Sequence, residues 1–291
     1  MKIALSTDTS CGISKELATK LNIQVFPLNV IVDGQEYLDG ITINQDQLLK
    51  DMRGKKNIKT STPPLGVIID YFEKLFAKGY DKVLHFTISS KLSSMNTLFK
   101  DVSHNNFDDK IIVIDSLSVC STMLSHVLFA YEELQKNTDL ETIQKLISER
   151  TTDGVTYFIP ENLTALKNGG RISPAIATLC NIIGIKPVLH FVDGALEKDT
   201  ITKNPKRYLH DKLSQLIKLY PIKDYDYSIA SFDSEKSLLS FLINEISLYD
   251  KDYPVSVVNV PINVCAHCGP GTLGLLVSKK INNKSLSDYL M

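Results

Sequence analysis

The sequence lacks the features of a nucleic-acid-binding or membrane-spanning protein. Its 291 residues hold 32 Lys and Arg against 33 Asp and Glu, a formal net charge of −1, and the basic residues are dispersed. Such a chain has no cluster of positive charge that would attract nucleic acid or an anionic membrane. No apolar run reaches the roughly 18 residues of a spanning helix, and Lys186 breaks the longest candidate. We therefore expect no nucleic-acid partner and no stable membrane insertion.

Cysteine is scarce, and the chain shows no secretion signal. The five cysteines are odd in number and mostly scattered through apolar segments, as in proteins of a reducing compartment. The first apolar stretch ends at Asp8, which makes it too short for the apolar core of a signal peptide. We expect a cytoplasmic protein.

Two motifs of nucleotide binding and catalysis are also missing. The phosphate-binding pattern Gly-x-x-x-x-Gly-Lys does not occur. The turn Gly-x-Ser-x-Gly, which presents a nucleophilic serine, is absent as well. We expect no nucleotide or other cofactor. Ser93, His267 and several aspartates are nevertheless present, and a catalytic triad is recognised by geometry, so a serine-dependent esterase or lipid hydrolase stays as the alternative function.

Buried strands alternate with helices in the first half of the chain. Apolar runs at 2–6, 23–32, 82–88 and 110–114 predict strands, and the apolar face of 65–76 recurs at helical spacing. This alternation predicts parallel βαβ units, whose ligands bind beyond the carboxyl ends of the strands.

The second half of the chain mixes hairpin and βα elements. Asp193-Gly194 lies between the predicted strands 185–192 and 196–201, the pattern of a β-hairpin. We predict an α/β protein with a parallel-sheet βαβ domain over 1–153 and an α+β domain over 154–291.

The stretch from Asn168 to Pro187 combines a cation with an apolar segment. Gly169 and Gly170 give two permissive backbone positions before Arg171, whose planar side chain suits a carboxylate or phosphate. Ser173, followed by proline, predicts a helix start. A ligand with an anionic head and an apolar body would fit here, and a glycine turn with a surface arginine is the alternative.

The C-terminal stretch from Cys265 to Gly271 has three interpretations. Cys265 and Cys268 form a Cys-x-x-Cys pair, but structural zinc needs two more ligands and no second pair occurs. A redox pair of the thioredoxin type begins a helix, whereas Gly-Pro-Gly follows directly here. The third interpretation holds His267 at a glycine-rich turn as a donor to an anion, and a surface-loop histidine remains open. We expect no metal site.

Eight stretches, in order along nearly the whole chain, resemble the DegV family of bacterial fatty-acid-binding proteins. The stretches that carry the resemblance are Ser6-Thr7-Asp8-Thr9-Ser10, Tyr37-Leu38-Asp39-Gly40, Lys59-Thr60-Ser61-Thr62-Pro63, Ile88-Ser89-Ser90-Lys91-Leu92-Ser93, Ile114-Asp115-Ser116, Asn168-Gly169-Gly170-Arg171-Ile172-Ser173, Ile185-Lys186-Pro187 and His267-Cys268-Gly269-Pro270-Gly271.

The resemblance implies a lipid carrier rather than an enzyme. It implies a two-domain protein that holds a long-chain fatty acid between the domains and presents the carboxylate to a separate fatty acid kinase for phospholipid synthesis. By position, Thr60, Ser61, Ser93 and His267 would meet the carboxylate. Arg171 matches the family arginine beside the pocket.

Further residues are expected around the fatty acid. Gly170 belongs to the site with Arg171, and the apolar segment that begins at Ile176 would line the acyl tunnel. Its expected wall residues are Ile176, Leu179, Ile182 and Ile183.

The chain departs from the family at one place near the head group. The family usually has Leu-Ser-Gly-Thr where this sequence has Leu92-Ser93-Ser94-Met95. Loss of that glycine would narrow the approach to the head group. The sequence therefore supports lipid binding more strongly than it supports coupling to a kinase. Thr62-Pro63-Pro64 also replaces the more usual Gln-Pro-Ser, a minor change.

Overall fold

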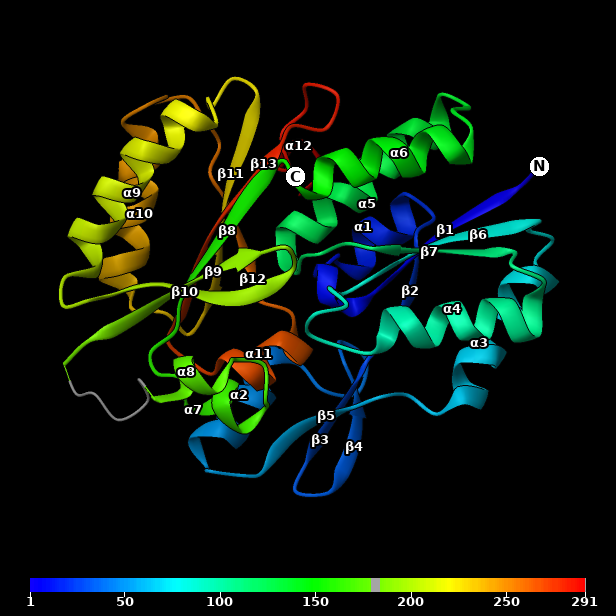
Figure 1. Cartoon of the computed structure of the whole chain (residues 1–291), viewed down its shortest axis with the longest axis horizontal. Coiled ribbons are helices and arrows are strands. Elements are labelled where there is room, and N and C mark those ends of the chain that lie inside the picture. The colour runs from blue at the N-terminus through cyan, green and yellow to red at the C-terminus, as the bar shows by residue number, and fades with distance from the viewer. Residues whose placement is uncertain (179–183, 291) are drawn as a thin grey trace.

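The computed structural model describes residues 1–178 and 184–290, and Figure 1 shows the arrangement of its elements. A four-stranded parallel sheet organises the first half of the chain. Its strands lie in the order β2 (Gln24–Phe26), β1 (Ile3–Asp8), β6 (Lys82–Thr87) and β7 (Ile111–Asp115). This confirms the predicted parallel sheet.

Helices cover both faces of this sheet because alternate side chains of a strand point to opposite faces. Ala4 and Val83 join the apolar cluster that holds Phe72 and Phe99, whereas Leu5 and Leu84 join a second cluster. The helices of this half are η1 (Thr9–Cys11), α1 (Lys15–Lys20), α2 (Gln45–Arg53), α3 (Leu65–Ala77), α4 (Met95–Phe107), α5 (Cys120–Gln135) and α6 (Leu140–Thr151).

A second, antiparallel sheet in this half was not predicted. Residues 23–32 do not form one strand: β2 ends at Phe26, and β3 (Asn29–Val32) belongs to a different sheet. Pro27 lies between them, and proline lacks the N–H that a continuous strand would need. Strand β3 pairs with β4 (Gln35–Leu38) and β5 (Ile58–Ser61). The sequence Tyr37-Leu38-Asp39-Gly40 also predicts a turn, which is partly wrong, since its first two residues end β4.

The second half of the chain builds a six-stranded mixed sheet. Only β11 and β12 pair in parallel, and helices α9 (Pro205–Leu219) and α10 (Lys236–Ser247) lie together beside the sheet (Figure 1). The predicted hairpin at Asp193-Gly194 is confirmed. The strand order is β10 (Ala195–Thr202), β9 (Lys186–Val192), β8 (Gly154–Ile159), β13 (Thr272–Lys279), β11 (Tyr225–Phe232) and β12 (Ser256–Asn259).

Helix α11 (Ile262–Cys268) connects the parts of the fold. It contacts η1, α2, β3 and β5 of the first half and α7 (Thr164–Asn168) of the second. The interpretation of 265–271 as a glycine-rich turn was wrong in part. His267 lies in the last turn of a helix, which ends at Cys268, and the glycines follow from Gly269 onward. The helix is short and nearly fully buried, so its apolar residues show no amphipathic period.

Two further predictions concern the stretch around Arg171. A proline favours the first position of a helix, which predicts a helix start at Pro160, but α7 begins at Thr164. The start at Ser173 is confirmed: its side chain accepts the Ile176 N–H, and α8 (Pro174–Ala177) follows. The expected tunnel residues Leu179, Ile182 and Ile183 lie outside the described residues.

The short helix α12 (Ser287–Leu290) ends the described chain. No helix within 1–178 and 184–290 has both the length and the apolar character needed to span a bilayer.

Candidate functional site

A largely apolar cavity lies where the two halves of the chain meet. It encloses about 980 Å³ of empty space, part of it open to solvent. Its apolar lining residues come from the first half, from β8, β9 and β10, and from the segments beside α7 and α11: Leu28, Ile88, Leu92, Met95, Val119, Phe158, Pro160, Leu166, Leu189, Phe191, Leu196 and Val264.

Most of the predicted site residues lie on the wall of this cavity. Thr60, Ser61, Ser93, Arg171 and His267 all line it, although they come from four separate parts of the fold: β5, the loop before α4, the turn after α7, and α11. The other two predicted residues do not line it: Gly170 is exposed, and Ile176 packs with Leu163, Leu166 and Leu189 in a small separate cluster.

The closest contact among the polar wall residues joins Thr60 to His267. Thr60 Oγ1 lies 2.8 Å from His267 Nε2. Because α11 packs against β5, the two side chains meet across the boundary between the sheet and the helix. One of the two donor protons of this pair is used in the hydrogen bond between its members, and the other, on the hydroxyl or the imidazole, can be donated to a carboxylate. The pair is therefore suited to an anionic head group.

Burial sets the charge state of His267. Its pKa is lowered to about 4, first by desolvation and second by the positive charge of Arg171. The imidazole is therefore neutral near pH 7 and has one N–H to donate.

Gly169 allows the imidazole of His267 to occupy its place. A Cβ atom at residue 169 would lie only 2.3 Å from His267 Nδ1. The two glycines before Arg171 therefore have different roles. Gly169 gives room to the imidazole, whereas Gly170 has a φ of +67°, which favours glycine.

Arg171 lines the cavity with its guanidinium already engaged by backbone carbonyls. Nε donates to the Leu92 carbonyl at 3.1 Å, and Nη1 donates to the Gly169 carbonyl. The arginine thus ties the loop before α4 to the turn after α7. Desolvation lowers its pKa from the ordinary value.

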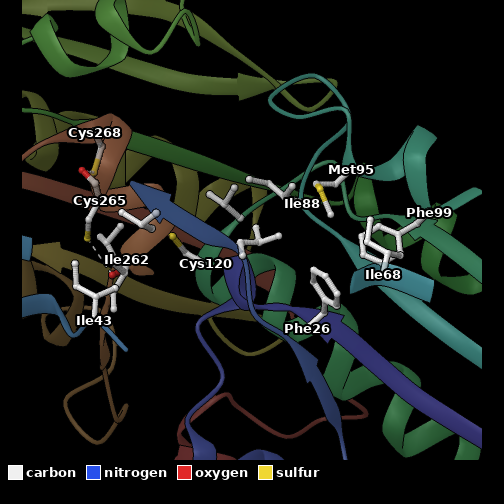
Figure 2. Close-up of a cluster of buried hydrophobic side chains, with 14 of the residues drawn as sticks. Phe26, Ile43, Ile68, Ile88, Met95, Phe99, Cys120, Ile262, Cys265 and Cys268 are labelled. Carbon is white, nitrogen blue, oxygen red and sulfur yellow. Dashed lines mark hydrogen bonds between the residues drawn. The ribbon is translucent and has the colours of Figure 1, made fainter. Parts of the chain in front are cut away.

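Ser93 lies one residue before the N-cap of α4. Its hydroxyl accepts the Met95 N–H at 3.4 Å, a long hydrogen bond that leaves the side chain available to a ligand. Ser94 is exposed at the cavity wall and makes no side-chain cap. Met95 is 2% exposed, and Figure 2 shows it among Ile88 and Phe99. The two residues that depart from the family pattern therefore both shape the cavity.

A second, outer groove adjoins the cavity. Both share Thr60, Arg171, His267 and Cys268 as lining residues. The groove continues outward along polar and basic side chains and glycines, namely Lys56, Asn57, Lys59, Asn162, Asn168 and Gly169. Apolar residues line the groove as well, among them Met52, Ile58 and Pro270. The Thr60–His267 pair thus lies between the apolar cavity and a groove of mixed character that carries Lys56 and Lys59.

Sequence reasoning missed two buried amides on the cavity wall. Asn29 is 7% exposed on β3, and Asn263 is 5% exposed on α11. Neither lies in a recognisable motif, and only the packing of α11 against β3 brings them to the same wall. Asn29 directly precedes the buried run Val30–Val32, and a polar residue at the start of an apolar strand was the only signal available.

The carboxyl ends of β1, β6 and β7 hold one another rather than a ligand. Asp8 accepts N–H groups from Ser10 and Ile88, at 2.8 and 2.7 Å, and Asp115 accepts from Ser90 at 3.1 Å. Desolvation raises the pKa of Asp8 to about 6. The predicted convergence of strand ends exists, but the carboxylates stabilise the loops beside the cavity.

The Cys-x-x-Cys pair is buried. Figure 2 shows Cys265 and Cys268 on α11, with Cys120 in the same cluster. Burial raises the pKa of Cys265 and Cys120 well above the ordinary value, which disfavours thiolate chemistry. Within the described parts of the chain, no group of three or more His, Cys, Asp or Glu is arranged to hold a metal ion.

One nucleotide-binding pattern escaped the sequence analysis. Residues 269–274 match Gly-x-Gly-x-x-Gly. In a dinucleotide site the pattern follows a strand and opens a helix, whereas here it follows α11 and opens β13. The reversed order removes the helix N-terminus that would face a pyrophosphate.

Comparisons with known proteins agree with this architecture. The family model described as "Uncharacterised protein, DegV family" matches residues 2–280. A DegV domain-containing protein from Listeria innocua is 30% identical over 288 residues, which cover 96% of this chain and 99% of the relative. One from Staphylococcus aureus is 27% identical over 283 residues, with 96% and 99% coverage.

Solved structures share the fold over nearly the full length. DegV from Bacillus subtilis, described as a fatty acid binding protein, has a TM-score of 0.83 at 25% identity and covers 96% of this chain and 100% of its own. A stearic acid-binding protein from Eubacterium ventriosum has a TM-score of 0.86 at 24% identity, with 97% and 99% coverage. The second likeness shows the fold alone.

Proposed function

Because this chain belongs to the DegV family, we propose that it binds a long-chain fatty acid in the cavity between its two halves. One observation carries the proposal: a cavity with an apolar wall has a hydroxyl–imidazole pair, Thr60 and His267, at one boundary. The fatty-acid-binding descriptions of several similar structures support the same ligand class.

The acyl chain supplies most of the affinity in this proposal. Burial of about fifteen methylenes contributes roughly 12 kcal/mol, at about 0.8 kcal/mol each, before the costs of association. Phe158, Leu189 and Phe191 on β8 and β9 line the cavity together with Leu28, Ile88 and Met95 from the first half of the chain.

We propose that Thr60, Ser93 and His267 hold the carboxylate, whereas Ser61, which the resemblance also assigns to it, has no hydrogen-bond partner among the described residues. An unpaired buried carboxylate would cost several kcal/mol, so hydrogen-bond donors must meet it. Neutral His267 and the two hydroxyls provide such donors without a bidentate arginine pair. Arg171, whose guanidinium is held by two carbonyls, adds positive charge nearby.

The bound carboxylate would also be accessible from the outer groove. We infer that a fatty acid kinase approaches there, because the groove reaches Thr60 and His267 and carries Lys56 and Lys59. A phosphoryl group is anionic, so basic side chains along the groove suit its arrival. Formation of acyl phosphate from the loaded protein, ATP and a purified kinase tests this step, and its absence would remove the kinase partner.

The geometry favours a carrier over a hydrolase. A serine nucleophile needs a general base within hydrogen-bond reach, yet the hydroxyl hydrogen-bonded to His267 Nε2 is that of Thr60. The Ser93 hydroxyl instead accepts a backbone N–H of its own loop.

Mass spectrometry of the denatured protein tests the proposal directly. Purified full-length protein should release a long-chain fatty acid in near-stoichiometric amount, or take one up after delipidation. Repeated preparations with no bound lipid and no uptake would refute the proposal. Turnover of an ester panel that disappears in Ser93→Ala and His267→Ala would favour the hydrolase instead.

A further inference from the structure

The cavity wall carries a second polar group of side chains, separate from the Thr60–His267 pair. It consists of Asn29, Ser61 and Asn263, which we call the amide cluster. Asn29 and Ser61 are register partners on the antiparallel strands β3 and β5. Side chains of directly opposed residues lie on one face of the sheet with Cβ atoms about 4.5–5.5 Å apart. Asn263 approaches from α11, which packs on both strands.

Two members of the amide cluster have unused hydrogen-bonding capacity. The hydroxyl of Ser61 is buried and has no partner among the described residues. The side-chain oxygen of Asn263 is likewise buried and unpartnered within the described chain, while its amide nitrogen donates to Ser10 Oγ at 2.7 Å. A buried polar atom left without a partner is costly. A ligand in the cavity can supply these missing partners.

The chemistry of the amide cluster selects a neutral polar group. None of its three side chains is charged, and the carboxylate of Asp39 lies directly behind Asn263, whose backbone N–H it accepts at 3.0 Å. An anion here would meet no cation of the cluster and would lie near a buried carboxyl group. A hydroxyl group both donates and accepts, so it satisfies serine and either end of an asparagine amide.

The position of the cluster fixes where that hydroxyl lies on the ligand. Ser61 follows Thr60 directly in β5, with Cα atoms about 3.8 Å apart. Successive side chains of a strand point to opposite faces, but Ser61 is the last residue of β5 and both residues line the cavity. Thr60 belongs to the proposed carboxylate site. The complementary hydroxyl must therefore be within the first few carbons from the carboxyl group, because farther along the chain the wall becomes apolar at Phe158 and Leu189.

We propose that the amide cluster is a subsite for a hydroxyl group on the acyl chain, so that the cavity prefers a 3-hydroxy fatty acid to the unsubstituted acid of equal length. This inference rests on the proposed function, since it assumes that the carboxylate occupies the Thr60–Ser93–His267 site. It adds 3-hydroxy fatty acids to the unsubstituted fatty acids of the proposed function.

Competitive displacement of a fluorescent fatty acid from delipidated full-length protein tests the subsite. The competitors are hexadecanoic acid, 3-hydroxyhexadecanoic acid and 12-hydroxyhexadecanoic acid. One satisfied buried hydrogen bond predicts that the 3-hydroxy acid binds about 3- to 10-fold more tightly than hexadecanoic acid. The 12-hydroxy acid should bind more weakly than hexadecanoic acid, because its hydroxyl faces the apolar wall.

Variants of the amide cluster assign the preference to these residues. Ser61→Ala and Asn29→Leu should each lower the affinity ratio of the 3-hydroxy acid to hexadecanoic acid toward one. Ser94→Ala is the matched control, since Ser94 lines the cavity outside the cluster and should leave the ratio unchanged. Two substitutions from different strands keep the test valid if one of the proteins misfolds.

The outcomes separate this inference from the proposed function. A wild-type protein that binds both acids equally, or a ratio that survives both variants, would overturn the subsite while leaving fatty-acid binding intact. Failure of all three acids to displace the probe, or of the probe to bind, would overturn the proposed function itself.

Discussion

The hydroxyl of Thr60 and the imidazole of His267 lie 2.8 Å apart, although 207 residues separate them in the chain. Strand β5 supplies one partner and the last turn of α11 the other. The pair therefore depends on the packing of the small antiparallel sheet against a helix from the far end of the sequence. Substitutions that move either partner should lower the affinity for the ligand more than they lower the stability of the fold.

Replacement of His267 by alanine should weaken the hold on the carboxylate more than the burial of the acyl chain. A lost hydrogen bond to a charged group costs about 1.5–3 kcal/mol, which predicts a roughly 10- to 100-fold lower affinity and a faster release. Stopped-flow displacement of a fluorescent fatty acid measures both. His210→Ala, on the exposed side of α9, is the control for loss of an imidazole. Unchanged exchange kinetics in His267→Ala would contradict the assigned role.

Gly169→Ala should reproduce much of this effect without removing the imidazole. The new Cβ would clash with His267 Nδ1, so the imidazole must leave its present position and its hydrogen bond to Thr60 is disturbed. We expect fatty-acid affinity to fall by about tenfold, the equivalent of one hydrogen bond of roughly 1.4 kcal/mol.

Two other glycines serve as controls for that substitution. A Cβ at residue 66 would meet open space, so Gly66→Ala should leave the fatty-acid affinity unchanged. Gly170→Ala should lower the free energy of unfolding by about 1 kcal/mol, because φ is +67° there, without displacing the imidazole. Equal affinities of Gly169→Ala and Gly66→Ala would show that His267 tolerates the contact.

Asp39 should make the protein less stable as the pH rises. Desolvation raises its pKa from 3.8 to about 7, so the native state keeps a proton that the unfolded chain has already released. Between these two values the free energy of unfolding falls with rising pH, and the loss is complete above about pH 7. Asp39→Asn removes this titration and should gain about 2–4 kcal/mol relative to wild type between pH 4 and pH 8.

Urea denaturation of both proteins across this pH range measures the difference. Asp70→Asn, on the exposed side of α3, controls for the loss of one carboxylate. The interpretation fails if the stability difference between Asp39→Asn and wild type is the same at both ends of the range.

The described cysteines should resist alkylation in the native protein. Burial raises the pKa of Cys11 to about 12 and the pKa values of Cys120 and Cys265 well above the ordinary value. Because the thiolate is the reactive form, iodoacetamide at pH 8 should label these three only after unfolding in urea. Peptide mass spectrometry reads out each site, and rapid labelling of Cys265 in the native chain would argue for a redox role.

Local signals allowed much of the fold to be predicted from the sequence. The hydroxyl of Ser173 caps α8, Asp193-Gly194 turns a hairpin, and the apolar period of α3 buries Ile68 and Phe72. Each of these depends on residues close together in the chain. The parallel sheet followed from the alternation of such elements.

Features that depend on packing were not predictable. The break at Pro27 was visible, but nothing local states that β3 leaves the parallel sheet to pair with β4 and β5. The helical state of α11 likewise comes from its burial between both halves. Asn263 reaches the cavity wall only through this packing. Sequence motifs therefore identified Ser61 and the residues around the Thr60–His267 pair but missed the two asparagines of the amide cluster.

The place of β13 in the second sheet has a consequence for synthesis. This last strand of the chain lies between β8 and β11, so neither can complete its pairing until about residue 279 has left the ribosome. A nascent chain that stops earlier holds two strand groups with unpaired edges, which are prone to aggregate. The second sheet can therefore close only after β13 has been made, and truncations that remove β13 should be recovered as insoluble material.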